Sequence, residues 1–189
     1  MKKLLIAFFF LPIVCFGQLG DYYNSNNHPK AKGLDFKIKS PLGFDQTEAN
    51  RPNIVQKWIK DSEDIDSQVT FLVLVVNLPN ELQDVSQQEW KQYIKYDGGL
   101  KELTQGVENV SNAKYYVLDN FPGVYYEGHS IGERLDVEMT AYQKMVQVFT
   151  LKHMFQIQMM TSNSNLLIEN ESLFNSLANS VIILNQYEN

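Results

Sequence analysis

The alternation of apolar and polar positions in the first half of the chain predicts three strands. Leu34, Phe36 and Ile38 are apolar at every second position, which is typical of a strand with one buried face. A second extended segment is predicted over residues 52–60. Residues 68–78 (QVTFLVLVVNL) are apolar almost without interruption, which indicates a central strand buried on both of its faces.

A different apolar period follows and predicts a helix. Ser86 and Glu89 have the spacing of a capping box, in which their side chains satisfy free backbone amides of the first helical turn. Trp90, Tyr93 and Ile94 then lie at positions i, i+3 and i+4, so one face of the helix can pack on the sheet. The Asp-Gly-Gly sequence that follows is expected to end this helix.

The second half of the chain returns to strand composition and closes with a helix. Extended segments are predicted at residues 115–117, 124–127, 135–141, 145–151 and 155–159. Apolar residues at helical spacing over 170–184 predict a C-terminal amphipathic helix. Strands joined as hairpins, with segregated helices, indicate the α+β fold class: one antiparallel β-sheet covered by helices. The simplest interpretation is a single domain over residues 33–187, preceded by a polar, flexible segment at 18–32.

The first 17 residues have the three parts of a secretory signal peptide. They are a basic start, an apolar run of about 13 residues and a small residue before a cut at Gln18. The run is too short to be a membrane anchor, which needs roughly 20 apolar residues. The alternative is a lipid anchor on Cys15, but Val14 stands where bacterial lipoprotein signals have a small residue. We therefore expect an exported protein, periplasmic or extracellular, without a transmembrane segment in the mature chain.

Composition and charge exclude several classes of protein. The chain has 189 residues, 44% of them apolar and 20% charged, which is unlike a disordered tail, a collagen or a coiled coil. Removal of the signal peptide takes away two lysines and lowers the formal net charge from −6 to −8. An acidic domain without a basic cluster is unsuited to nucleic acid or an anionic membrane. Without Cys15 the mature chain has no disulfide or thiolate chemistry.

Catalytic and cofactor motifs are absent from the sequence. It has no G-x-S-x-G elbow and no glycine-rich phosphate loop, so we predict neither an enzyme nor a cofactor. Glu127 and His129 share a strand face, and with His153 approaching from a neighbouring strand these three residues are candidates for a metal site. The alternative is that both histidines are surface or hairpin-end residues. The acidic run at residues 61–66 lacks the spacing of an EF-hand calcium loop, and we interpret it as a solvated connection.

Paired tyrosines provide the best candidates for an interaction surface. Tyr115-Tyr116 and Tyr125-Tyr126 are adjacent pairs, so in an extended chain one tyrosine of each pair faces away from its neighbour. Exposed Tyr116 or Tyr126 beside Arg51 or Arg134 would suit a protein interface, because tyrosine and arginine are enriched at binding hot spots. The alternative is that helices cover both faces and bury these rings.

Short motifs along the chain resemble the PsbP-like fold family. They are the opening Phe36-Lys-Ile-Lys-Ser-Pro-Leu-Gly-Phe44, then Arg51-Pro-Asn-Ile-Val55, and Leu173-Phe174-x-Ser-Leu177 in the closing helix. The resemblance implies an αβα sandwich and a non-enzymatic domain that docks on larger assemblies or serves as an accessory factor. Photosynthetic members have a docking region near the N-terminus; here that region has only Lys30 and Lys32. No binding residue is carried over.

The sequence therefore predicts an exported, non-catalytic accessory or adaptor protein that binds another cell-envelope or secreted protein. The alternative is a periplasmic carrier of a small ligand or lipid, with a pocket between sheet and helix. A pocket lined by Met139, Phe149 or Met159 would favour the carrier. A flat aromatic patch over a filled core would favour the adaptor.

Overall fold

The computed structural model describes residues 18–60, 67–105, 107–134 and 137–184. The predicted signal peptide with Cys15 and the acidic run at 61–66 lie outside the described residues. None of the described helices is long and apolar enough to span a membrane.

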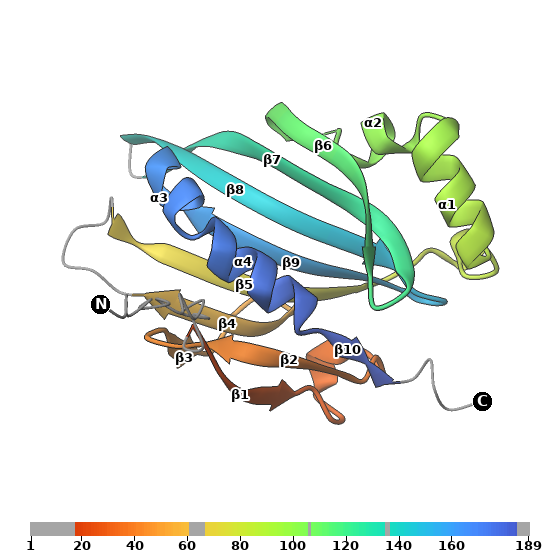
Figure 1. The fold of residues 1–189 in the computed structure, drawn as a ribbon, viewed down its shortest axis with the longest axis horizontal. Coiled ribbons are helices and arrows are strands. Elements are labelled where there is room, and N and C mark those ends of the chain that lie inside the picture. Colours follow the sequence, from red (N-terminus) through yellow and green to blue (C-terminus); the bar gives the residue numbers. More distant parts are fainter. Residues whose placement is uncertain (1–17, 61–66, 106, 135–136, 185–189) are drawn as a thin grey trace, which may run out of the picture.

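A large antiparallel sheet forms the centre of the molecule (Figure 1). In spatial order its seven strands are β3 (Asp45–Thr47), β4 (Ile54–Lys60), β5 (Val69–Asn77), β9 (His153–Thr161), β8 (Val137–Phe149), β7 (Phe121–Arg134) and β6 (Glu108–Leu118). The continuous apolar strand is confirmed as β5, which lies inside the sheet between β4 and β9. The predicted segments 135–141 and 145–151 contribute to one long strand, β8, because both pair with β7 without interruption over the described residues.

The turn between β6 and β7 is tighter than the sequence pattern indicates. The predicted connection runs from Asp119 to Gly123, whereas in the structure only Asp119 and Asn120 form the turn. Both have positive φ, 45° and 69°, as a two-residue hairpin turn with matching strand twist requires. Phe121 and Gly123 therefore belong to β7 and pair with Leu118 and Tyr116.

A second sheet of three strands packs beside the first and includes the segment predicted to be flexible. Its strands are β1 (Leu19–Asn24), β2 (Phe36–Pro41) and β10 (Ile182–Ile183), in the order β1-β2-β10. The structure corrects the prediction for 18–32: β1 pairs with β2, and Ala31 in the short helical turn η1 (Pro29–Ala31) is only 1% exposed. The polar composition of this segment hid its backbone pairing, which does not depend on apolar side chains.

The helices lie on opposite faces of the large sheet. The capping box is confirmed at α1 (Gln87–Tyr96): the Ser86 hydroxyl accepts from the amide of Glu89, whose carboxylate accepts from the amide of Ser86. A short α2 (Gly99–Leu103) follows it. The predicted C-terminal helix is observed as α4 (Glu171–Asn179), which is shorter than predicted. A separate short helix, α3 (Ser164–Glu169), precedes it. Residues 182–183 leave the helix because they pair with β2 as β10.

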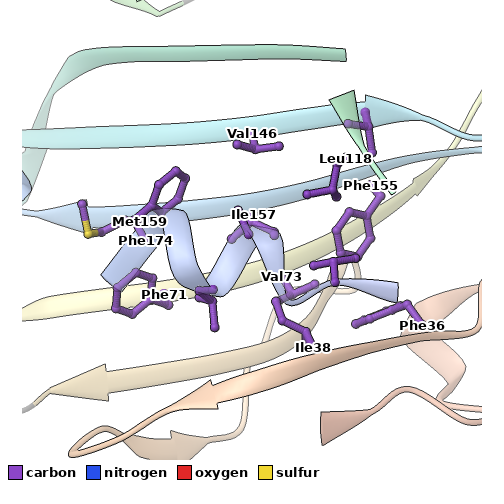
Figure 2. Packing of buried hydrophobic residues seen from close by; sticks show 14 of the residues in the cluster. Phe36, Ile38, Phe71, Val73, Leu118, Val146, Phe155, Ile157, Met159 and Phe174 are labelled. Atoms are coloured by element: carbon purple, nitrogen blue, oxygen red, sulfur yellow. The ribbon is translucent and has the colours of Figure 1, made fainter. Parts of the chain in front are cut away.

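We call the sheet face toward α4 and the small sheet the closed face, and the opposite one the open face. Figure 2 shows apolar side chains of the closed face converging on α4. They come from β5, β8 and β9 and meet Phe36 and Phe174, all fully buried. On the open face α1 buries a smaller apolar cluster against β7 and β8, in which Trp90 stacks on Phe149 with ring centroids 4.1 Å apart. Beyond that cluster, toward β4 and β5, the open face carries no described helix.

Candidate binding groove

A groove of about 560 Å³ lies on the open face, at the end of the sheet away from α1. We call it the Arg51 groove. It is lined by Glu48, Ala49, Asn50, Arg51, Ile54, Lys57, Gln68, Thr70, Leu72, Met139, Thr140, Ala141, Met160, Thr161 and Ser162. These residues come from the loop before β4 and from strands β4, β5, β8 and β9, so distant parts of the chain form one surface.

The floor of the Arg51 groove is apolar. Ala49, Ile54 and Leu72 form a small cluster, and the partly buried Met160 packs against it. Leu72 is on the open face because its neighbours Phe71 and Val73 are fully buried in the core on the closed face. The continuous apolar run of β5 thus serves both faces: one side fills the core and the other forms a floor for binding.

The rim of the groove carries two cationic side chains. Arg51 is exposed and Lys57 is half-buried, and neither forms an ion pair with any residue that the structure describes. Glu48 is the acidic residue of the lining. An apolar floor beside an available guanidinium suits a protein segment that combines apolar side chains with a carboxylate.

Lysines of the N-terminal segment hold the wall of the groove. Lys30 Nζ donates to the carbonyl of Ala49, and Lys32 Nζ donates to Asn53 Oδ1 at 2.6 Å. The carbonyl of Lys32 lies 3.0 Å from His153 Nε2 at the start of β9. Burial is the main cause that lowers the pKa of His153 below its ordinary value. Neutral His153 donates from Nε2 to this carbonyl and ties the wall to the sheet.

The tyrosines predicted to form an interface lie elsewhere. Tyr126 is only 3% exposed beneath α1, its hydroxyl is 2.8 Å from Met145 Sδ, and burial raises its pKa to about 12. Tyr126 therefore cannot present a surface in this fold, because the α1 cluster covers it. Tyr116 is half-buried on the closed face, where its hydroxyl donates to Asn179 Oδ1 at 3.1 Å. Arg51 lines the groove and Arg134 is the last residue of β7, and the interface roles of both arginines stay predictions.

The three candidate metal ligands do not converge. Glu127 accepts hydrogen bonds from Tyr125 and Asn112 and forms an ion pair with Lys144 at 3.0 Å. His129 Nε2 lies 2.7 Å from Asn109 Nδ2, and His153 is at the opposite end of the sheet, paired with Asn77. No group of three potential metal ligands occurs among the residues that the structure describes. Strand order and register both separate these side chains, because β8 lies between β7 and β9 and His153 is at the far end of β9.

The three residues proposed to line a carrier pocket, Met139, Phe149 and Met159, lie at three different places in the structure. Met139 lines the Arg51 groove. Phe149 is buried under Trp90, and Met159 is fully buried in the closed-face core. The sequence pattern does not identify Lys57, Leu72 or Met160 as site residues. Their alternation with core residues is visible in the sequence, but only strand order shows that they share one groove.

Comparison with known proteins identifies the fold. No family model and no curated protein matches the sequence. Among solved structures, the chain is similar to LpqN of Mycobacterium tuberculosis, described as involved in cell envelope biogenesis, with 13% identity, a TM-score of 0.50 and coverage of 78% of this chain and 82% of that one. Cyanobacterial PsbP from Synechocystis also matches, with 14% identity, a TM-score of 0.47 and coverage of 90% and 95%. So does the Ran-binding protein Mog1p of Saccharomyces cerevisiae, with 9% identity, a TM-score of 0.46 and coverage of 87% and 96%.

At these identities the likeness concerns the fold and not the activity. An antiparallel sheet between α4 on one face and α1 on the other agrees with the architecture predicted from the sequence. The chain has an α+β fold with a large antiparallel sheet, which is consistent with the PsbP-like fold that its sequence motifs resemble.

Proposed function

We propose that this chain is an exported, non-catalytic accessory or adaptor protein, and that it binds another cell-envelope or secreted protein through the Arg51 groove. The observation that carries the proposal is the apolar floor of Ile54 and Leu72 beside a guanidinium that has no ion-pair partner among the described residues. Arginine is enriched at binding hot spots, where its guanidinium can pair with a carboxylate of the partner.

The way the wall is held also supports a binding role. Lys30 and Lys32 fix the loop that carries Arg51, so a partner meets a surface that is already ordered. A preformed surface reduces the entropy lost on association, and more of the contact energy then appears as affinity. The partner segment that fits this groove has apolar side chains for the floor and a carboxylate for Arg51 or Lys57.

The experiment is a crosslinked pull-down of the tagged mature protein from its native cell envelope, read by mass spectrometry. Arg51→Glu should abolish capture of a reproducible protein partner. Lys101→Glu makes the same change in charge on the exposed side of α2, outside the groove, and should retain that partner. Capture that survives Arg51→Glu would overturn this assignment of the groove.

A carrier of a small apolar ligand is the second candidate, because Met139 and Met160 line the groove. The groove volume of about 560 Å³ is within the usual range for small-molecule sites. A bound small molecule released when the purified protein is denatured, together with no captured protein, would favour the carrier over the adaptor. The proposed adaptor instead releases no stoichiometric small molecule.

A further inference from the structure

A second groove, of about 660 Å³, lies between α1 and the hairpin of β6 and β7. We call it the Tyr96 groove. Its lining residues are Gln87, Gln88, Lys91, Gln92, Tyr96, Tyr115, Val117, Asn120 and Pro122. It shares no residue with the Arg51 groove and lies toward the β6 edge of the sheet, whereas the Arg51 groove lies over β4 and β5. The function proposed above does not use this second groove.

The Tyr96 groove presents apolar surface that the fold does not cover. Tyr96 is 71% exposed and Val117 is 49% exposed, whereas Pro122, which pairs with Val117 across the hairpin and also lines the groove, is buried. Tyr96 and Val117 are both large side chains left open to solvent although the open face buries a neighbouring cluster beneath α1. An exposed aromatic ring beside other apolar groups, rimmed by polar residues, is typical of a protein interaction site.

The charge of the Tyr96 groove is opposite to that of the whole protein. Lys91 lines it, and Lys95 extends over the Tyr115 ring with Nζ 4.4 Å from the centroid. None of the described residues that line the groove is acidic, although the chain carries a formal net charge of −6. Neither lysine forms an ion pair within the described part of the chain. This local positive charge attracts acidic partners and repels basic ones.

Gln87, a lining residue of the Tyr96 groove, has a side-chain amide that is buried and unpaired within the described residues. Its side-chain Nε2 and Oε1 are buried, and neither has a hydrogen-bond partner among the described residues. An unpaired buried polar group costs about 1–3 kcal/mol, so a group that pairs with it is favoured. A peptide backbone offers both a carbonyl acceptor and an amide donor, the two kinds of partner that this side chain lacks.

We propose that the Tyr96 groove binds an acidic polypeptide segment of a partner protein, whose carboxylates pair with Lys91 and Lys95 while an apolar side chain packs on Tyr96 and Val117. This step rests on the function proposed above for the Arg51 groove: the two grooves share no residue, so one partner in each would let the protein hold two partners at once. This makes it an adaptor in the strict sense, a bridge between two proteins.

A pair of labelled peptides tests the proposal. The acidic probe is the 12-residue peptide (Glu-Leu-Asp-Gly)₃ and its neutral match is (Gln-Leu-Asn-Gly)₃, both followed by fluorescence anisotropy with the full mature protein. We expect the acidic peptide to bind about tenfold more tightly than the neutral one, and its affinity to fall at high salt. Failure of the acidic peptide to bind at about 1 mM, or equal binding of the two peptides, overturns the proposal.

Matched double variants locate the binding. Lys91→Glu with Lys95→Glu should weaken the acidic peptide about tenfold or more, because attraction becomes repulsion. Lys101→Glu with Lys152→Glu changes the net charge equally at two exposed positions outside both grooves and should leave binding within about twofold. Equal loss in both double variants would show that net charge alone controls binding and would overturn the assignment. Binding to phosphatidylglycerol vesicles without binding to the peptide would also overturn it.

Tyr96→Ala tests whether apolar contact in the Tyr96 groove contributes to peptide binding in addition to the positive charge. The ring is exposed, so its removal should not alter folding, which the unchanged thermal transition would verify. We expect about fivefold weaker peptide binding with an unchanged salt dependence, because the variant removes apolar contact and no charge. Unchanged affinity would overturn the role of the groove.

Discussion

The closed and open faces of the seven-stranded sheet carry different kinds of side chain and are covered to different extents. On the closed face, Phe71, Phe155 and Met159 are fully buried against α4 and the small sheet. Between α1 and the Arg51 groove, the open face carries glutamines instead. Gln156 donates to Gln147 at 2.6 Å, and Gln158 donates to Gln143.

The difference shows how one sheet can be stable and still have surface for binding. Apolar side chains must be covered, so the closed face needs a helix and a second sheet. Glutamines that pair across neighbouring strands satisfy one another, so this part of the open face needs no helix. Stability is therefore concentrated on the closed face, and both proposed binding grooves lie on the open one.

Among the variants that test this contrast between the faces, we expect the largest loss of unfolding free energy at Phe155. Its ring is fully buried and meets Phe36 edge to face, with centroids 5.0 Å apart. Phe155→Ala should lower the free energy of unfolding by about 3–5 kcal/mol, as measured by urea denaturation. Gln156→Ala, the next residue and on the opposite face, should lower it by only about 1 kcal/mol. Equal losses would contradict the division of labour between the faces.

A buried charge on the closed face gives the second effect. Lys144 is 3% exposed and pairs with Glu127 at 3.0 Å and with the more exposed Glu171 at 3.3 Å. Lys144→Met removes the cation and leaves Glu127 poorly solvated, so we expect a loss of about 2–3 kcal/mol at neutral pH. Lys114→Met removes an exposed lysine, whose charge lies over the Tyr125 ring, and should cost less than about 1 kcal/mol. A larger loss for Lys114→Met would contradict this account.

The same pair predicts how stability depends on pH. Burial alone would raise the pKa of Glu127, but hydrogen bonds from Tyr125, Asn112 and Lys144 outweigh it and hold the pKa below its ordinary value. A depressed carboxyl pKa stabilises the fold above the pKa of the unfolded chain, and this contribution is lost as pH falls through the folded pKa. Lys144→Met should therefore flatten the decline in unfolding free energy between about pH 5 and pH 3. An unchanged decline would show that other carboxylates cause it.

The capping box of α1 gives a smaller effect, on the open face. The amide of Glu89 donates to Ser86 Oγ at 3.2 Å. Ser86→Ala should lower the free energy of unfolding by about 1 kcal/mol, whereas Ser86→Asp, which keeps an acceptor, should retain most of the stability. Hydrogen exchange should speed up in the first turn of α1 and stay unchanged in β5. Faster exchange across β5 would show that α1 supports the whole sheet.

The smallest effect on stability is expected in the Arg51 groove. Arg51 is exposed and lies in a loop, so Arg51→Glu should change the free energy of unfolding by no more than about 0.5 kcal/mol. The same variant should lose its protein partner in the pull-down, which separates binding from stability. A marked loss of stability would mean that Arg51 serves the fold rather than a partner.

The sequence was most informative where a local pattern has one physical solution. Ser86 and Glu89 predicted the start of α1, and the alternation of Phe36 and Ile38 predicted β2. It was less informative where pairing overrides local propensity. Ile182 and Ile183 continue a helical pattern, yet they form β10 because β2 offers them backbone hydrogen bonds.

The candidate site was predictable only in part. Arg51 lines the proposed groove, and its role as an interface residue stays a prediction. Tyr126 is buried, because an adjacent pair of tyrosines predicts opposite faces without showing which face a helix covers. Leu72 and Met160 come together across β5 and β9 from positions 88 residues apart in the sequence. Strand register brings such residues together, and register is a long-range property.

The sequence by itself determined the α+β class, the positions of most strands and the start of α1, because these follow from apolar periodicity and from capping within a few residues. Tertiary structure alone decided that β1 is ordered, that Tyr126 is buried and that two grooves remain on the open face. These features depend on which strands are neighbours and which face each helix covers, and contacts between distant segments settle both.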